Sequence, residues 1–211
     1  MCNWFAIGGS VFGRLWVVDR VPATLLGALA DLVKWLDAAK IPSMVIGGVA
    51  ASVLGQPRLT QDVDALAILP EAEWADAVTT AAGFGIIPRI ENTLDFARRS
   101  RVLLMRHAPS GIDIDLTFGR LSFEQTAIDN SQIYDIGGVR VRLPRVEDLL
   151  IMKAIARRPK DLLDIEGLLA ARPDADLVAV RQWVREFATA MSMSDMLDDF
   201  DNVVARSKSK R

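Results

Sequence analysis

Residues 46–64 read IGGVAASVLGQPRLTQDVD, and the fold of the chain can be inferred outward from this stretch. A diglycine, Gly47-Gly48, follows a short apolar run, and the stretch closes on Asp62 and Asp64, which one valine separates. Alternate side chains of a β-strand point to the same face, so the two carboxylates lie side by side if the segment is extended. Adjacent carboxylates repel one another unless a cation lies between them, and Mg²⁺ is a cation that takes oxygen ligands.

The diglycine adds a second feature to the same stretch. A glycine turn that opens a helix presents bare backbone N–H groups, and such groups bind phosphate oxygens. We therefore expect Gly47 and Gly48 to bind phosphate and Asp62 and Asp64 to bind metal. Together the two features indicate nucleotide chemistry.

A third carboxylate is expected on a neighbouring strand, because three carboxylates usually hold the pair of metal ions that serves phosphoryl transfer. Residues 111–118 read GIDIDLTF, which places Asp113 and Asp115 on one face. We expect Asp115 to be the third ligand, with Asp113 as the substitute. Asp-x-Asp pairs are otherwise typical of solvated strand edges, but two pairs and a correctly spaced diglycine favour the metal site.

The spacing also carries a resemblance to a known family. Thirteen residues separate the diglycine from the Asp-Val-Asp segment, and this pattern resembles the signature of the polymerase-β-like nucleotidyltransferases. The fuller pattern, with Arg58 and Thr60 before the aspartates, is similar to the AbiEii-type toxin nucleotidyltransferases and their bacterial relatives. The resemblance implies an α/β core with a mixed sheet, followed by a C-terminal helical region.

The resemblance also implies an activity. A nucleotidyltransferase of this kind transfers an NMP from an NTP to a hydroxyl group and releases pyrophosphate, with two Mg²⁺ ions as cofactors and Mn²⁺ as the alternative. The acceptor would be tRNA or a protein, and a toxin of this type would have a cognate antitoxin as partner. Two alternatives stay open: a transferase that modifies a small molecule such as an antibiotic, and a non-catalytic nucleotide- or partner-binding module.

A second block that resembles the family runs from residue 144 to residue 166. It places Lys153 on a helix, where we expect its ammonium group to contact nucleotide phosphates. Asp161 and Asp164 stand three residues apart on one side of the next helix. The resemblance implies that one of them orients Lys153 or touches the nucleotide. The alternative is that Asp161 caps this helix, with Asp164 in the capping-box position. Arg58 would contact a phosphate or form a salt bridge with Asp62.

Composition limits the other function classes. The net charge of −2 gives nucleic acid no general electrostatic attraction to the chain. The single cysteine excludes an internal disulfide and a cysteine-based zinc site. The only histidine, His107, is expected on a surface turn. No apolar run approaches the ~18 residues of a membrane span, so we expect a cytoplasmic protein with no membrane contact.

The order of predicted elements gives the domain organisation. Strand patterns stop near residue 143, and only helical periodicity follows them. We expect a nucleotidyltransferase α/β domain over residues 1–143, beginning with an arm over residues 1–20. A C-terminal helical domain is expected over residues 144–205, and a basic tail over residues 206–211.

Overall fold

The computed structural model describes residues 21–209. The arm expected over residues 1–20 lies outside the described residues. The strands are β1 (Ser43–Val45), β2 (Asp62–Ala67), β3 (Ile86–Pro88), β4 (Val102–His107), β5 (Ile112–Phe118), β6 (Gln132–Ile136) and β7 (Val139–Leu143). The helices are α2 (Ala23–Ala38), α3 (Gly47–Leu54), α4 (Trp74–Ala81), α5 (Thr93–Ser100), α6 (Ser122–Asp129), α7 (Val146–Ala156), α8 (Pro159–Ala171), α9 (Leu177–Ala190) and α10 (Met196–Ser209), and two 3₁₀ turns, η1 (Glu71–Glu73) and η2 (Ala82–Phe84), flank α4.

Five strands form one mixed sheet in the order β1-β2-β5-β4-β3. β2 and β5 run parallel at its centre, and the other neighbouring pairs are antiparallel. β6 and β7 form a separate hairpin, joined by Gly137 and Gly138 in the left-handed conformation that a two-residue turn requires. The α/β class and the mixed sheet expected from the sequence are confirmed.

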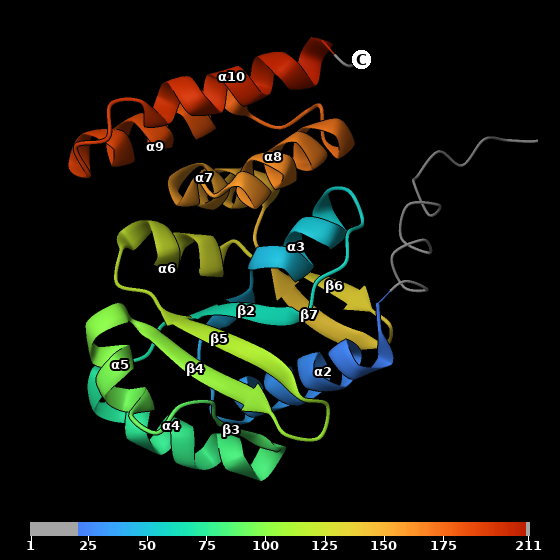
Figure 1. Cartoon of the computed structure of the whole chain (residues 1–211), viewed down its shortest axis with the longest axis vertical. Coiled ribbons are helices and arrows are strands. Elements are labelled where there is room, and N and C mark those ends of the chain that lie inside the picture. Colours follow the sequence, from blue (N-terminus) through green and yellow to red (C-terminus); the bar gives the residue numbers. More distant parts are fainter. Residues whose placement is uncertain (1–20, 210–211) are drawn as a thin grey trace, which may run out of the picture.

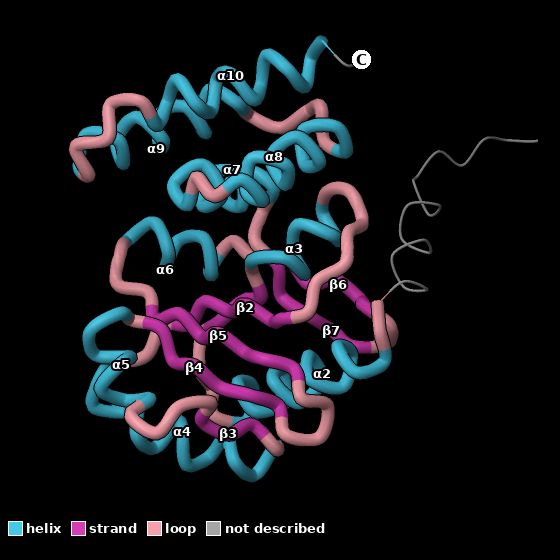
Figure 2. Tube along the Cα trace, in the orientation of Figure 1, coloured by secondary structure: helices cyan, strands magenta, loops and turns pink. Residues whose placement is uncertain are grey.

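Helices cover both faces of the sheet (Figure 1). α6 and α7 lie on one side of it, and α2 and α4 lie on the other. Figure 2 shows the five-stranded sheet as a layer between these helices, with α8 beside α7, and α9 and α10 beyond these two. One continuous apolar core joins the layers, and it includes Leu29 of α2, Ile114 of β5, Leu150 of α7 and Phe200 of α10. The helical region after β7 therefore folds onto the strand-containing region.

Two local expectations need correction. The helix α10 runs to Ser209, so the basic tail does not begin at residue 206. His107 is buried, because Ser110 of the following turn and Asp31 of α2 both bind its imidazole ring. No helix between residues 21 and 209 combines the length and apolar character that crossing a membrane requires.

Candidate functional site

The parallel pairing of β2 with β5 brings the acidic residues together. Asp62 lies opposite Asp113 and Asp64 lies opposite Asp115, so all four side chains share one face of the sheet. Neighbouring strands are about 4.8 Å apart, which places each carboxylate next to the one across from it. Asp64 and Asp115 line one cavity of about 270 Å³ together with Gly47.

The glycine turn closes this cavity on one side. Ile46 donates its backbone N–H to the carbonyl of Asp64 at 2.9 Å, which fixes the end of β1 beside β2. Gly47 has a φ of +62°, and a Cβ atom at this position would lie 1.8 Å from Oδ2 of Asp64. Only glycine lets the backbone come this close. The N–H of Gly48 hydrogen-bonds the Asp64 carboxylate, so the diglycine positions this aspartate as well as facing the cavity.

Two arginines distinguish Asp113 from Asp115. Nη1 of Arg89 lies 2.7 Å from Asp113, and Nε of Arg106 lies 2.8 Å from the same carboxylate. Asp115 accepts one hydrogen bond, at 2.9 Å, from Nη2 of Arg89. Asp115 lines the cavity with Asp64, whereas Asp113 is held between the two guanidinium groups. This arrangement favours Asp115 over Asp113 as the partner of Asp62 and Asp64.

Burial and mutual repulsion change the acidity of the cluster. Burial, reinforced by the charges of Asp62 and Asp115, raises the pKa of Asp64. Burial also raises the pKa of Asp115, because the nearby Arg89 only partly offsets burial and the charge of Asp62. For Asp113, burial alone would raise the pKa, but Arg106 and Arg89 outweigh it and hold the pKa below its usual value.

The cluster fits a hard divalent cation by its chemistry. Its donors are carboxylate oxygens, the ligands that Mg²⁺ and Mn²⁺ prefer. Burial and the neighbouring carboxylate charges raise the pKa values of Asp64 and Asp115, and a bound cation would offset both effects. Within residues 21–209, however, no three His, Cys, Asp or Glu side chains are already arranged as a metal centre. Asp62 instead accepts a hydrogen bond from Thr60 at 2.9 Å.

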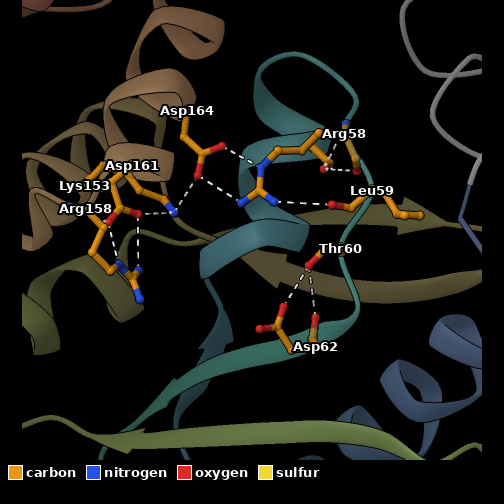
Figure 3. A network of polar contacts seen from close by, with 9 residues as sticks. Arg58, Leu59, Thr60, Asp62, Lys153, Arg158, Asp161 and Asp164 are labelled. Atoms are coloured by element: carbon orange, nitrogen blue, oxygen red, sulfur yellow. Dashed lines mark hydrogen bonds and ion pairs between the residues drawn. The ribbon is translucent and has the colours of Figure 1, made fainter.

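Lys153 lies in a buried ionic network on the far side of the cavity (Figure 3). Its Nζ is 2.9 Å from Oδ1 of Asp161 and 2.8 Å from Oδ2 of Asp164, and the lysine side chain is only 3% exposed. The structure thus places the ammonium group between two carboxylates. Both aspartates orient Lys153, which is one of the roles expected for them.

The network ends on two arginines. Arg58 donates to both oxygens of Asp164, at 2.6 and 3.1 Å, and therefore does not pair with Asp62 as one expectation had it. Arg158 donates through Nε to Asp161 at 2.6 Å. Asp161 also accepts the backbone N–H of Arg158, so Asp161 holds the capping-box position that was expected for Asp164. Burial alone would raise the pKa of Asp161, but Arg158 and Lys153 outweigh it and lower this pKa.

Two site residues escaped prediction from the sequence. Arg158 lines the cavity with a side chain that is 57% exposed, so its guanidinium group is accessible to a ligand. Arg89 reaches Asp113 and Asp115 from the end of β3, across the intervening strand β4. The basic segment around Arg158 was visible in the sequence, but no sequence pattern indicated Arg89.

Solved structures share this architecture. The antibiotic-resistance factor ANT(2'')-Ia superimposes with a TM-score of 0.56 at 14% identity, over 82% of this chain and 97% of that chain. The chain has a nucleotidyltransferase fold. An antigenic nucleotidyltransferase-like protein from Paracoccidioides brasiliensis matches with a TM-score of 0.46 at 17% identity, over 85% of this chain and 94% of that chain. A CCA-adding enzyme in complex with CTP matches with a TM-score of 0.37 at 12% identity, over 88% of this chain and 52% of the CCA-adding enzyme chain.

These similarities are similarities of fold. No protein-family model matches the sequence, and no curated protein matches it. The similarity to AbiEii-type toxins, drawn from the residues around Arg58 and Asp62, stays a prediction.

Proposed function

We propose that this chain is a nucleotidyltransferase that moves an NMP from an NTP to a hydroxyl group. The observation that carries the proposal is the register of β2 and β5, which puts Asp62, Asp64 and Asp115 on one face beside the Gly47 turn. A chain with only a structural use for this face would not need to hold partly buried, mutually repelling carboxylates in a cavity.

Asp115 is the proposed base. Asp115 lines the cavity beside Asp64, where an acceptor hydroxyl group can approach it, and Arg89 donates one hydrogen bond to it at 2.9 Å. In the proposed reaction the acceptor oxygen forms a bond to the α-phosphorus of the NTP as its proton passes to Asp115. The bond from the α-phosphorus to the bridging oxygen breaks, and pyrophosphate leaves with the electron pair.

Asp62 and Asp64 are the proposed holders of divalent cation, Mg²⁺ or Mn²⁺, with Asp115 as the third ligand of a two-ion site. When bound, such cations neutralise charge on the phosphates. The backbone N–H of Gly48 hydrogen-bonds Asp64, so this carboxylate is already positioned to bind a cation before any ligand arrives. Asp113 is the less favoured substitute, because Arg89 and Arg106 already neutralise it.

Arg158 is the proposed phosphate-binding cation. It lines the cavity with Asp64, and its side chain is more than half exposed, so its guanidinium group can also bind a phosphate oxygen. Asp161, which pairs with Lys153, accepts hydrogen bonds from Nε and Nη2 of Arg158 and holds it in place. Gly47, Gly48 and Arg58 are further candidates for phosphate binding. Lys153, Asp161 and Asp164 contribute by holding the side chains of Arg58 and Arg158 through their ionic network.

Two kinds of acceptor are candidates. The resemblance to AbiEii-type toxins suggests tRNA or a protein as acceptor and a cognate antitoxin as partner, in a cytoplasmic toxin–antitoxin or phage-defence system. The fold shared with an antibiotic-resistance factor supports a small-molecule acceptor as the second candidate.

The test is transfer of label from α-³²P-labelled NTPs with Mg²⁺ to total tRNA or to a small-molecule alcohol, in separate reactions, alongside pyrophosphate release. We expect the wild-type chain to give both signals with its acceptor, and we expect neither signal from Asp64→Asn or from a reaction that contains EDTA. Asp95→Asn is the matched control, because Asp95 pairs with Arg98 on exposed α5, away from the cavity. Tight NTP binding without pyrophosphate release under any condition would instead identify a non-catalytic binding module.

A further inference from the structure

A second cavity adjoins the proposed site along the same sheet face. It encloses about 490 Å³ and shares three lining residues with the carboxylate cavity, Ile46, Thr117 and Met152. Thr117 stands two residues beyond Asp115 on β5, a distance of about 6.6 Å along a strand. A molecule in the second cavity would therefore hold a hydroxyl group within reach of Asp115.

The lining of this cavity is apolar. Beyond the shared residues, its wall is built from Leu66 of β2 and from residues in or next to α6, α7 and α9, among them Phe123, Glu124, Phe187 and Ala190. Among the described residues that line it, Glu124 is the charged one. Its Oε2 already accepts the backbone N–H groups of Arg120 and Leu121, at 2.8 and 2.9 Å, as part of the cap of α6.

Resting on the proposed function, we infer that this cavity binds the acceptor, and that the acceptor is an uncharged small molecule with an apolar, aromatic body and a hydroxyl group. The volume lies within the range of small-molecule pockets, roughly 300–1,000 Å³. Phe123 and Phe187 present two aromatic rings to the occupant. The hydroxyl group points to Asp115, which takes its proton as the oxygen bonds the α-phosphorus and pyrophosphate departs.

The lining argues against other occupants. A polycationic acceptor such as an aminoglycoside requires several carboxylates that can pair with its ammonium groups. The described lining of this cavity offers one carboxylate, Glu124, and Oε2 of that carboxylate already accepts two backbone N–H groups. The edge of a nucleobase carries N–H and C=O groups, which would be left unpaired against this wall at about 1–3 kcal/mol each. An aromatic hydrocarbon body carries no such groups, so it gains from burial without this cost.

A binding experiment tests the occupant separately from turnover. The probe is 2-naphthalenemethanol, measured by isothermal titration calorimetry on the full chain, with kanamycin as the polycationic comparison. Ala190→Glu adds a charge at the rim of the cavity on an exposed residue at the end of α9. Thr189→Glu adds the same charge one position earlier on the same helix, where the exposed side chain does not line the cavity.

We expect the wild type and Thr189→Glu to bind the alcohol equally, and Ala190→Glu to bind it at least tenfold more weakly. Mg²⁺–ATP affinity should be the same in all three, and wild type should form labelled adenylyl-naphthalenemethanol from α-³²P-ATP. Three results would overturn the inference: equal alcohol binding by all three proteins, displacement of the alcohol by ATP, and transfer of the label to kanamycin alone. So would self-association of the chain that Ala190→Glu abolishes, because the occupant would then be a second copy.

Failure of the proposed function gives a different pattern. In that case the alcohol binds in an Ala190→Glu-sensitive way, while neither ATP binding nor pyrophosphate release is detected. That result overturns the acceptor assignment together with the nucleotidyltransferase proposal. Normal pyrophosphate release with tRNA and no alcohol binding overturns the acceptor inference alone.

Discussion

Replacing Gly47 with alanine should damage the site more than it damages the fold. Gly47 is in the left-handed region, with φ +62°, where a Cβ costs about 1–2 kcal/mol. The new Cβ would also lie 1.8 Å from Oδ2 of Asp64. Because contacts below 3.0 Å are essentially never seen for Cβ atoms, the carboxylate must retreat by about 1.2 Å. Overpacking of this kind adds about 1–3 kcal/mol of destabilisation, and a misplacement of ~1 Å at a reacting centre costs on the order of 10²-fold in rate.

Gly138→Ala is the matched control for the backbone cost. Gly138 also has a positive φ, +85°, but it lies in the β6–β7 turn with no atom within 4 Å of the added Cβ. Urea unfolding should show a loss of about 1–2 kcal/mol for Gly138→Ala and a larger loss for Gly47→Ala. Pyrophosphate release per folded molecule should be unchanged in Gly138→Ala and about 100-fold lower in Gly47→Ala. Equal activity in the two variants would refute the claim that Gly47 positions Asp64.

Three further predictions follow from the charges around the cavity. Asp115→Asn should lower the rate of pyrophosphate release at least 100-fold, because Asp115 lines the cavity. Asp113→Asn should lower this rate by less than tenfold, because Asp113 is paired with Arg106. The reverse order in steady-state kinetics would make Asp113 the base. Lys153→Met should lower the free energy of unfolding in urea by about 3–5 kcal/mol, since it leaves two buried carboxylates facing each other; a loss below about 1 kcal/mol would contradict the network. The raised pKa of Asp64 means that the folded state binds its proton more tightly than the unfolded state, so wild-type stability falls as pH rises from 3.8 through that pKa. Asp64→Asn should therefore melt above wild type at pH 7 without metal, and this difference should disappear below pH 3.8 in thermal melts; an unchanged difference across this range would refute the assignment.

The sequence alone predicted the sheet face well, because that prediction rests on local periodicity. Alternation along β2 and β5 puts Asp62 and Asp64 on one face of their strand and Asp113 and Asp115 on one face of theirs. The diglycine identified the turn before α3 for a similar reason, since no other residue type allows its close approach to Asp64. Local patterns of this kind need no knowledge of distant parts of the chain.

The choice between the two β5 aspartates could not be made in this way. Asp113 and Asp115 have the same periodicity, and Arg89 contacts both of them. The arginine that separates their roles is Arg106, which lies opposite Asp113 on the neighbouring strand β4 and pairs with it. His107 shows the same limit: it was expected on a surface turn, but it ends β4 with a buried side chain, and Asp31, 76 residues away in the chain, hydrogen-bonds its imidazole ring. Lys153 was expected to contact nucleotide phosphates, and nothing in its own helix indicated that Asp161 and Asp164 of the next helix would both pair with its ammonium group.

The central claim is that Asp62, Asp64 and Asp115 together bind the cation that serves nucleotidyl transfer. The most direct measurement is the anomalous scattering of Mn²⁺ in a crystal grown with a non-hydrolysable NTP. We predict a Mn²⁺ peak coordinated by Asp62 and Asp64, next to Asp115 and the nucleotide phosphates, with the Arg89–Asp115 contact released. A bound nucleotide whose Mn²⁺ lies away from these carboxylates, with the contact between Arg89 and Asp115 intact, would contradict the claim.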